Sequence, residues 1–123
     1  MKESGIKTLV AALLLSLVAA CGGPPLPADK RDYAGDWRAN GMRLLIAANG
    51  NVSYERVRTG EHTTINAPIQ RFEGASFFVG LGPVTTRFEV TKPPHQEGSV
   101  WKMTVDGVEL TRAALGAGDD RSA

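Results

Sequence analysis

Short runs of alternating apolar and polar residues, separated by Gly, Pro, Asn and Asp, fill most of this 123-residue chain. From Tyr33 to Arg112 no window repeats its apolar residues with the 3.6-residue period of a helix. A period of two places every second side chain on the same face of a strand, and turn residues mark where strands end. The sequence therefore predicts an all-β domain, a small antiparallel meander of about seven or eight short strands that forms a barrel or a sandwich.

The expected strands are bounded by these turn residues. They cover Asp36–Ala39, Met42–Ala47, Asn51–Arg58, Thr63–Ile69, Ser76–Val79, Val84–Val90, Ser99–Val105 and Val108–Arg112. We interpret residues 93–98, Pro-Pro-His-Gln-Glu-Gly, as a loop and residues 80–83 as a tight connection. The apolar residues of the segment 70–81 do not alternate cleanly, so the pattern says least about that part of the sheet.

The last predicted hairpin turns at Asp106-Gly107. A two-residue type I′ loop there sets the register of the flanking strands. This register pairs Val105 with Val108, Met103 with Leu110 and Trp101 with Arg112. All three pairs lie on one face, which brings the Arg112 guanidinium near the Trp101 ring.

At Asn49-Gly50 a two-residue loop would place apolar residues of one strand opposite Ser53 and Glu55. A three-residue loop, residues 48–50 with Gly50 left-handed in a bulge, corrects this. It sets Ile46 opposite Val52 and Leu44 opposite Tyr54. Apolar packing therefore favours the bulge.

The same alternation predicts the core residues on one face of each strand. They are Met42, Leu44, Ile46, Val52, Tyr54, Val84, Thr86, Phe88, Val90, Trp101, Met103, Val105, Val108 and Leu110.

The first 20 residues read as a signal peptide. Lys2 and Lys7 precede an uncharged apolar run from Leu9 to Ala20, which is shorter than the roughly 20 apolar residues that span a bilayer. The run ends in Leu-Val-Ala-Ala directly before Cys21, the single cysteine of the chain. This ending resembles the lipobox of bacterial lipoproteins, and the resemblance implies cleavage before Cys21 and acylation of its thiol. Several acyl chains give stable attachment to a lipid bilayer.

We expect four segments: the signal peptide 1–20, the lipidated cysteine and a Pro-rich tether 21–32, the β domain 33–112 and a disordered tail 113–123. Gly22, where lipoproteins retained in the inner membrane commonly carry Asp, predicts an outer-membrane anchor facing the periplasm. The chain has 14 Lys and Arg and 13 Asp and Glu. Lys2, Lys7 and Glu3 lie in the leader, which leaves 12 of each. This neutral balance gives no reason to expect nucleic acid as a partner.

Gly35-Asp36-Trp37 resembles the Gly-x-Trp opening of the lipocalin and wider calycin barrels. In that family the tryptophan closes one end of the barrel and an arginine from a late strand stacks on it. The resemblance implies that role for Trp37 and for Arg112 at the end of the last strand. The chain is shorter than a lipocalin, and the alternative is that Trp37 simply opens a strand and packs in the core.

Two kinds of small envelope lipoprotein are also similar in size and strand content. Those that inhibit lysozyme carry a cysteine pair and a Ser-rich loop, which this chain lacks, so that activity is not carried over. The arrangement looks most like small β-rich lipoproteins of Gram-negative bacteria with no assigned activity, and this resemblance implies none.

We expect no catalysis, no cofactor and no metal site. His62 and His95 lie in polar, turn-like contexts and too far apart in the sequence for ligand spacing. The serines of the strands lack a neighbouring base, and the glutamates are scattered. No Gly-rich phosphate loop precedes a helix.

Three arginines are candidate binding residues. Arg56 and Arg58 continue the Val52–Tyr54 face toward the strand end, and with Arg87 they suit the carboxylates or phosphates of envelope polymers such as peptidoglycan or lipopolysaccharide. The alternative is that they pair with Glu55, Glu73 or Glu89 across strands.

The sequence thus predicts a lipid-tethered interaction module that contacts an envelope protein or polymer. The alternative is a calycin-like binder of a small apolar ligand, with a pocket lined by Trp37, Phe88 and Trp101. A filled interior would favour the module.

Overall fold

The structure is a computed structural model that describes residues 25–114. This part of the chain contains nine strands and one short 3-10 helix, η1, at Ala28–Tyr33. The strands are β1 (Gly35–Ala39), β2 (Met42–Ile46), β3 (Asn51–Arg58), β4 (Glu61–Glu73), β5 (Ser76–Leu81), β6 (Val84–Phe88), β7 (Val90–Glu97), β8 (Val100–Val105) and β9 (Val108–Arg112). The all-β prediction is confirmed, with nine strands instead of seven or eight.

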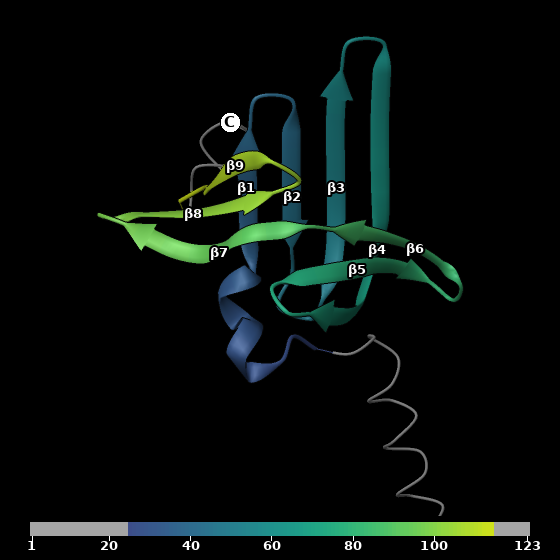
Figure 1. Cartoon of the computed structure of the whole chain (residues 1–123), viewed down its shortest axis with the longest axis horizontal. Coiled ribbons are helices and arrows are strands. Elements are labelled where there is room, and N and C mark those ends of the chain that lie inside the picture. The colour runs from purple at the N-terminus through teal and green to yellow at the C-terminus, as the bar shows by residue number, and fades with distance from the viewer. Residues whose placement is uncertain (1–24, 115–123) are drawn as a thin grey trace, which may run out of the picture.

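All neighbouring strands are antiparallel and belong to one curled half-barrel sheet. The spatial order is β6-β5-β4-β3-β2-β1-β9-β8-β7, so β1 lies beside the last strand of the chain. Figure 1 shows β5 to β9 running across β1 to β4. The two edges of the sheet, β6 and β7, follow each other in the chain and meet at Glu89.

Two polar groups hold this junction of β6 and β7 to the rest of the sheet. The backbone N–H of Glu89 donates to the Asp106 carboxylate (2.9 Å), and the Asp106 N–H donates to the Glu89 carbonyl (2.8 Å). The buried Ser76 hydroxyl accepts from the Val90 N–H at 3.0 Å. The sheet therefore curls toward closure without a backbone ladder between its edge strands.

The register predicted at the β2–β3 turn is confirmed. Ile46 pairs with Val52 and Leu44 with Tyr54. Gly50 has a φ of 90°, and its N–H donates to the Ala47 carbonyl. Only a glycine adopts this conformation without cost, so the sequence Asn-Gly selects the loop.

The β8–β9 turn is confirmed for two of its three predicted pairs, Val105 with Val108 and Met103 with Leu110. The same register continues to Lys102 and Thr111, where the β8–β9 ladder ends one residue before the third predicted pair. On its other side β9 pairs with β1, where Arg112 lies opposite Trp37.

The prediction of a loop at residues 93–98 is wrong. His95, Gln96 and Glu97 belong to β7 and pair with β8, after register shifts on either side of Lys92. Strand β7 is an edge of the sheet. Prolines are tolerated there, because the backbone position that lacks an N–H can face solvent instead of a neighbouring strand. The expected strand Val84–Val90 is also divided, because the chain changes partner at Glu89.

The predicted core is correct for most of its members but wrong for Val84 and Thr86. Val84 is 75% exposed and Thr86 is also exposed; both lie on the edge strand β6, and Val84 is next to the turn that joins it to β5. Trp101 and Val108 are half-buried. The alternation did not reveal several buried residues: Leu26, Tyr33, Ile69, Phe77 and Val79.

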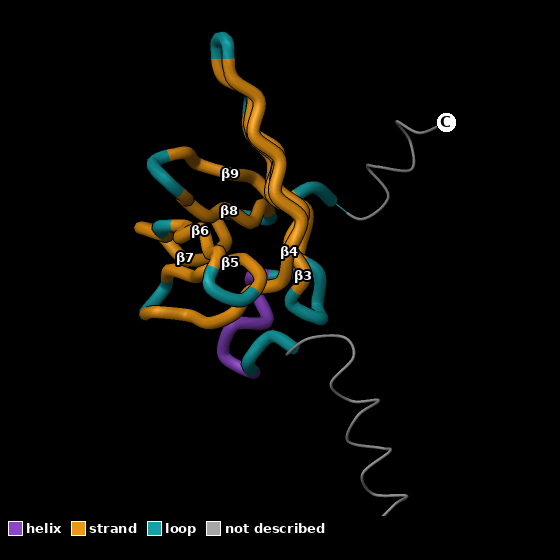
Figure 2. Tube along the Cα trace, turned by 90° about the vertical axis from the view of Figure 1, so that its right-hand side faces the viewer, coloured by secondary structure: helices purple, strands orange, loops and turns teal. Residues whose placement is uncertain are grey.

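Strand β4 contributes to two parts of the sheet. Its first residues pair with β3, and after a register shift between Ile69 and Arg71 its last residues pair with β5. The β3–β4 turn lies far from the core, and residues 55–64 are exposed except for a half-buried Arg56. We call residues 55–64 the projecting hairpin, and Figure 2 shows it rising beyond the other strands.

Candidate functional site

The expected site residues fall into two groups and one separate arginine, while Cys21 lies outside the described residues. In residues 25–114 no helix has the length and apolar character needed to cross a membrane. Trp37, Trp101 and Arg112 come together at one end of the half-barrel. Arg56 and Arg58 lie on the projecting hairpin.

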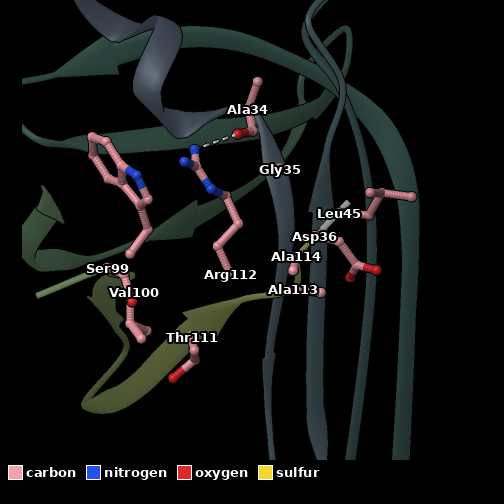
Figure 3. A pocket seen from close by; sticks show the side chains of 11 residues that line it. Ala34, Gly35, Asp36, Leu45, Ser99, Val100, Thr111, Arg112, Ala113 and Ala114 are labelled. Atoms are coloured by element: carbon pink, nitrogen blue, oxygen red, sulfur yellow. Dashed lines mark hydrogen bonds between the residues drawn. The ribbon is translucent and has the colours of Figure 1, made fainter. Parts of the chain in front are cut away.

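The first group is a stack of one guanidinium between two indoles. The Arg112 Cζ atom lies 4.5 Å from the Trp101 ring centroid and 5.6 Å from the Trp37 ring centroid. Figure 3 shows the Arg112 guanidinium directed toward the Ala34 carbonyl, to which it donates at 3.4 Å. Arg112 thus contacts both rings between which the sequence left a choice.

Gly35 makes this stack sterically feasible. A Cβ atom on Gly35 would overlap the Arg112 Cδ atom, and its φ of 152° is one that other residues rarely adopt. The Trp37 indole N–H donates to the Tyr33 carbonyl at 2.8 Å, and Trp37 is completely buried. The Gly-x-Trp triplet therefore places a ring in the core and an arginine across the glycine.

Helix η1 covers this end of the half-barrel. Tyr33 is buried, packs edge-on against Phe72 and Phe77, and donates its hydroxyl to the Ala75 carbonyl at 2.7 Å. Burial, with a smaller contribution from Asp29, raises the pKa of the Tyr33 phenol. We call this end, formed by η1 with Tyr33, Trp37 and Arg112, the plugged end.

The chain reaches η1 through a segment that is also packed. Leu26 is buried, and its N–H donates to the Ala48 carbonyl at 3.4 Å. These residues belong to the segment 21–32 that the sequence suggested as a tether. From Leu26 onward that segment lies against the sheet.

An open surface pocket of about 860 Å³ lies beside Arg112 and is lined by Val100, Trp101 and Leu45, among others. Asp36 also borders the pocket and is held by Arg43 (3.1 Å) and by Arg38. Burial would raise the pKa of the Asp36 carboxyl, but hydrogen bonds and charge from the two arginines outweigh it and lower that pKa. The pocket is open to solvent and lies outside the packed interior.

The interior of the half-barrel is filled by side chains. Phe88 stacks on Phe77 with ring centroids 5.2 Å apart, and Tyr54 meets Phe88 edge-on at 4.9 Å. Trp37 and Phe88 are 0% and 1% exposed. Their rings are therefore occupied by packing and do not line an internal space for a ligand.

The second group lies on the face of the projecting hairpin that continues from Tyr54. Arg56 pairs with Thr63 and Arg58 with Glu61 in the β3–β4 register. These side chains form a polar pocket of about 280 Å³, lined by Tyr54, Arg56, Arg58, Glu61, Thr63 and Asp106. No ion pair among residues 25–114 involves Arg56 or Arg58.

Arg87 behaves differently from these two arginines. It lies 3.7 Å from the Glu89 carboxylate, on the outer face of β6. Arg87 therefore has a carboxylate neighbour two residues along the chain, and none of the cross-strand pairs considered for the three arginines forms among residues 25–114.

The two histidines lie on strands instead of in turns. His62 on β4 contacts Glu55 at 3.0 Å, and His95 on β7 contacts Glu97 at 2.8 Å. In the described part of the chain, no three potential metal-ligating side chains are grouped together.

Sequence reasoning identified the arginines of the hairpin but not all of their surroundings. The period of two places Tyr54, Arg56 and Arg58 on one face and could be read directly. Asp106 comes from the β8–β9 turn, and no local pattern predicts that this turn lies beside β3.

Comparison with models of protein families, with curated proteins and with solved structures found no match.

Proposed function

We propose that this protein is a lipid-anchored lipoprotein of the bacterial cell envelope whose β domain is an interaction module without catalysis. The observation that carries the proposal is a pair of arginines, without an ion pair among residues 25–114, on a hairpin that projects from a filled domain. A hairpin that adds little to the core is available for contact with a partner. The lipobox-like sequence before Cys21 supports the anchor.

The arginines define what the module would recognise. Arg56 and Arg58 are two residues apart on one strand face, so their Cα atoms are separated by about 7 Å. Each guanidinium can bind a carboxylate or phosphate with two parallel hydrogen bonds. The envelope polymers that carry such groups, peptidoglycan and lipopolysaccharide, are the first partners to test.

The anchor is tested by expressing the full chain in a Gram-negative host, with and without Cys21→Ser. Metabolic lipid labelling and outer-membrane fractionation should find labelled, membrane-bound wild type and unlabelled, soluble mutant. Unlabelled wild type released into the periplasm would contradict the anchor.

The module is tested by co-sedimentation of the C21S protein with purified peptidoglycan, and with lipopolysaccharide in parallel. Replacing both Arg56 and Arg58 by Gln should weaken binding at least tenfold, because each charge-assisted hydrogen bond contributes about 1.5–3 kcal/mol. The matched control is Arg87→Gln, which removes an arginine that already has a carboxylate partner. Equal loss in both variants would indicate nonspecific charge attraction.

A calycin-like binder of a small apolar ligand is the second candidate. The pocket beside Trp101 and Arg112 supports it, since Leu45 and Val100 expose apolar surface there. The packed rings of Trp37 and Phe88 favour the interaction module. Titration with an apolar dye, followed by tryptophan fluorescence in wild type and Val100→Asp, separates the two.

A further inference from the structure

The start of the described chain and the projecting hairpin lie at opposite ends of the domain. Both views show η1 and the start of the described chain at one end and the β3–β4 turn at the other (Figures 1 and 2). Contacts at the first end are specific: Leu26 bonds to Ala48, and Tyr33 bonds to Ala75. The chain therefore enters the domain at a fixed place.

The distance between the lipid and this entry point is short. The buried Leu26 is only five positions after Cys21, and a fully extended chain of that length spans at most about 18 Å. Pro24, Pro25 and Pro27 further limit bending, because proline fixes φ. An acyl group on Cys21 would hold the plugged end within that distance of the bilayer.

We infer that the anchored domain stands with its plugged end at the membrane and presents the projecting hairpin, with Arg56 and Arg58, to a carboxylate-bearing glycan polymer away from the membrane surface. This inference rests on the lipid anchor of the proposed function. It adds an orientation, a contact surface and a class of partner.

The lining of the hairpin pocket selects a polar polymer. Arg56 and Arg58 supply donors for carboxylates, and Glu61 and Thr63 supply acceptors for the hydroxyl groups of sugars. Protein interfaces instead centre on apolar or aromatic anchors, and Val57, which is 55% exposed, points to the opposite face of the hairpin. The chemistry therefore favours a glycan with acidic groups.

The charge of the projecting hairpin gives it no electrostatic attraction to an anionic lipid bilayer. Its five ionisable residues include two arginines, two glutamates and His62, so it has no basic excess for an anionic membrane. The end near the anchor also mixes signs, with Lys30 and Arg31 beside Asp29 and Asp32. The orientation of the domain at the membrane would therefore be set by the site of lipid attachment and not by surface charge.

The test places a fluorescent label on either end of the lipidated full-length protein. Arg31→Cys labels η1 and Thr59→Cys labels the tip of the hairpin; both positions are exposed. The purified lipoproteins are reconstituted in phosphatidylethanolamine–phosphatidylglycerol vesicles that contain a lipid with a spin-labelled head group. We expect severalfold stronger quenching of the label at residue 31 than of the label at residue 59.

A flexible spacer between Cys21 and the domain tests whether the short connection causes the difference in quenching. Ten Gly and Ser residues inserted after Gly23 should reduce the difference between the two labels, because the domain can then tumble at the surface. Vesicles carrying the wild type should also co-sediment with purified peptidoglycan, and vesicles carrying R56Q/R58Q should not.

The possible failures differ. Equal quenching of the two labels, or stronger quenching at residue 59, would overturn the orientation while the anchor stands. Vesicles that fail to co-sediment although the C21S protein binds the polymer would overturn it as well. A chain that is never lipidated would overturn the proposed function and this inference together.

Discussion

The plugged end and the projecting hairpin share the alternating strand pattern, but the inward positions hold apolar residues at the first and arginines at the second. At the plugged end, alternation points Trp37 and Leu110 into a core that η1 covers, and the polar atoms that remain find partners. On the projecting hairpin the corresponding positions are the half-buried Arg56 and the exposed Arg58, which line an open polar pocket instead of an apolar core.

This difference shows that the sheet continues past its core. Backbone pairing extends β3 and β4 to Arg58 and Glu61, although the side chains there bury little apolar surface. Stability should therefore reside at the plugged end and binding at the hairpin. Four changes test this division, from the largest expected effect to the smallest.

Trp37→Ala should have the largest effect on stability. Removing a fully buried aromatic ring leaves a cavity and costs about 3–5 kcal/mol. Urea unfolding followed by circular dichroism measures the loss. Val57→Ala on the hairpin is the control and should change the unfolding free energy by less than about 0.5 kcal/mol. Similar losses in the two variants would remove the distinction between the regions.

Gly35→Ala should destabilise the domain by about 1–3 kcal/mol, because the added methyl group meets Arg112 and the backbone conformation becomes strained. Gly60→Ala in the turn of the hairpin provides the comparison, since it has positive φ but nothing near its Cβ position. Thermal unfolding of both variants separates backbone strain from the clash. If the two variants lose equal stability, the clash with Arg112 does not contribute to the destabilisation of Gly35→Ala.

Tyr33 should make the plugged end sensitive to alkali. A phenol whose pKa is raised in the folded state contributes stability below its unfolded pKa near 10, and this contribution is lost as the pH rises through the folded pKa. Tyr33→Phe should cost about 0.5–1.5 kcal/mol at pH 7, through the lost bond to Ala75, and should lose less stability above pH 10. The test is urea unfolding of wild type and Tyr33→Phe at pH 7 and above pH 10. If the unfolding free energy of both proteins falls by the same amount, Tyr33 is not the cause of the alkaline destabilisation.

Replacing Arg56 and Arg58 by Gln should leave stability within about 0.5 kcal/mol of wild type, since neither arginine forms an ion pair within the described part of the chain. The same variant should lose binding to peptidoglycan. Thermal unfolding and co-sedimentation on one protein sample measure both quantities. A clear drop in stability would show that the hairpin arginines are part of the folded framework.

Local patterns predicted the parts of this fold that depend on neighbours in the sequence. The turn at Gly50 and the pairs Ile46–Val52 and Met103–Leu110 follow from a short loop and a period of two. Errors occur where the chain changes partner. Val84 and Thr86 alternate correctly, but whether their face is covered depends on a distant layer.

The candidate site divides in the same way. The sequence placed Arg56 and Arg58 on one face and suggested that Arg112 meets a tryptophan. The hairpin register indicated Trp101 and the Gly-x-Trp resemblance indicated Trp37, and Arg112 contacts both rings because β9 lies between β8 and β1. Whether an arginine finds a carboxylate also depends on side chains from other strands, as the contact of Arg43 on β2 with Asp36 on β1 shows.

By itself the sequence determined the all-β class and the hairpin registers beside tight turns, because alternation and turn chemistry act over a few residues. It also carries the lipobox-like motif on which the proposed anchor rests. The tertiary structure decided that β1 pairs with β9, that Leu26 and η1 pack against the sheet, and that the hairpin projects from the opposite end. The physical reason is that strand order and burial arise from contacts between residues far apart in the chain, which a period of two does not encode.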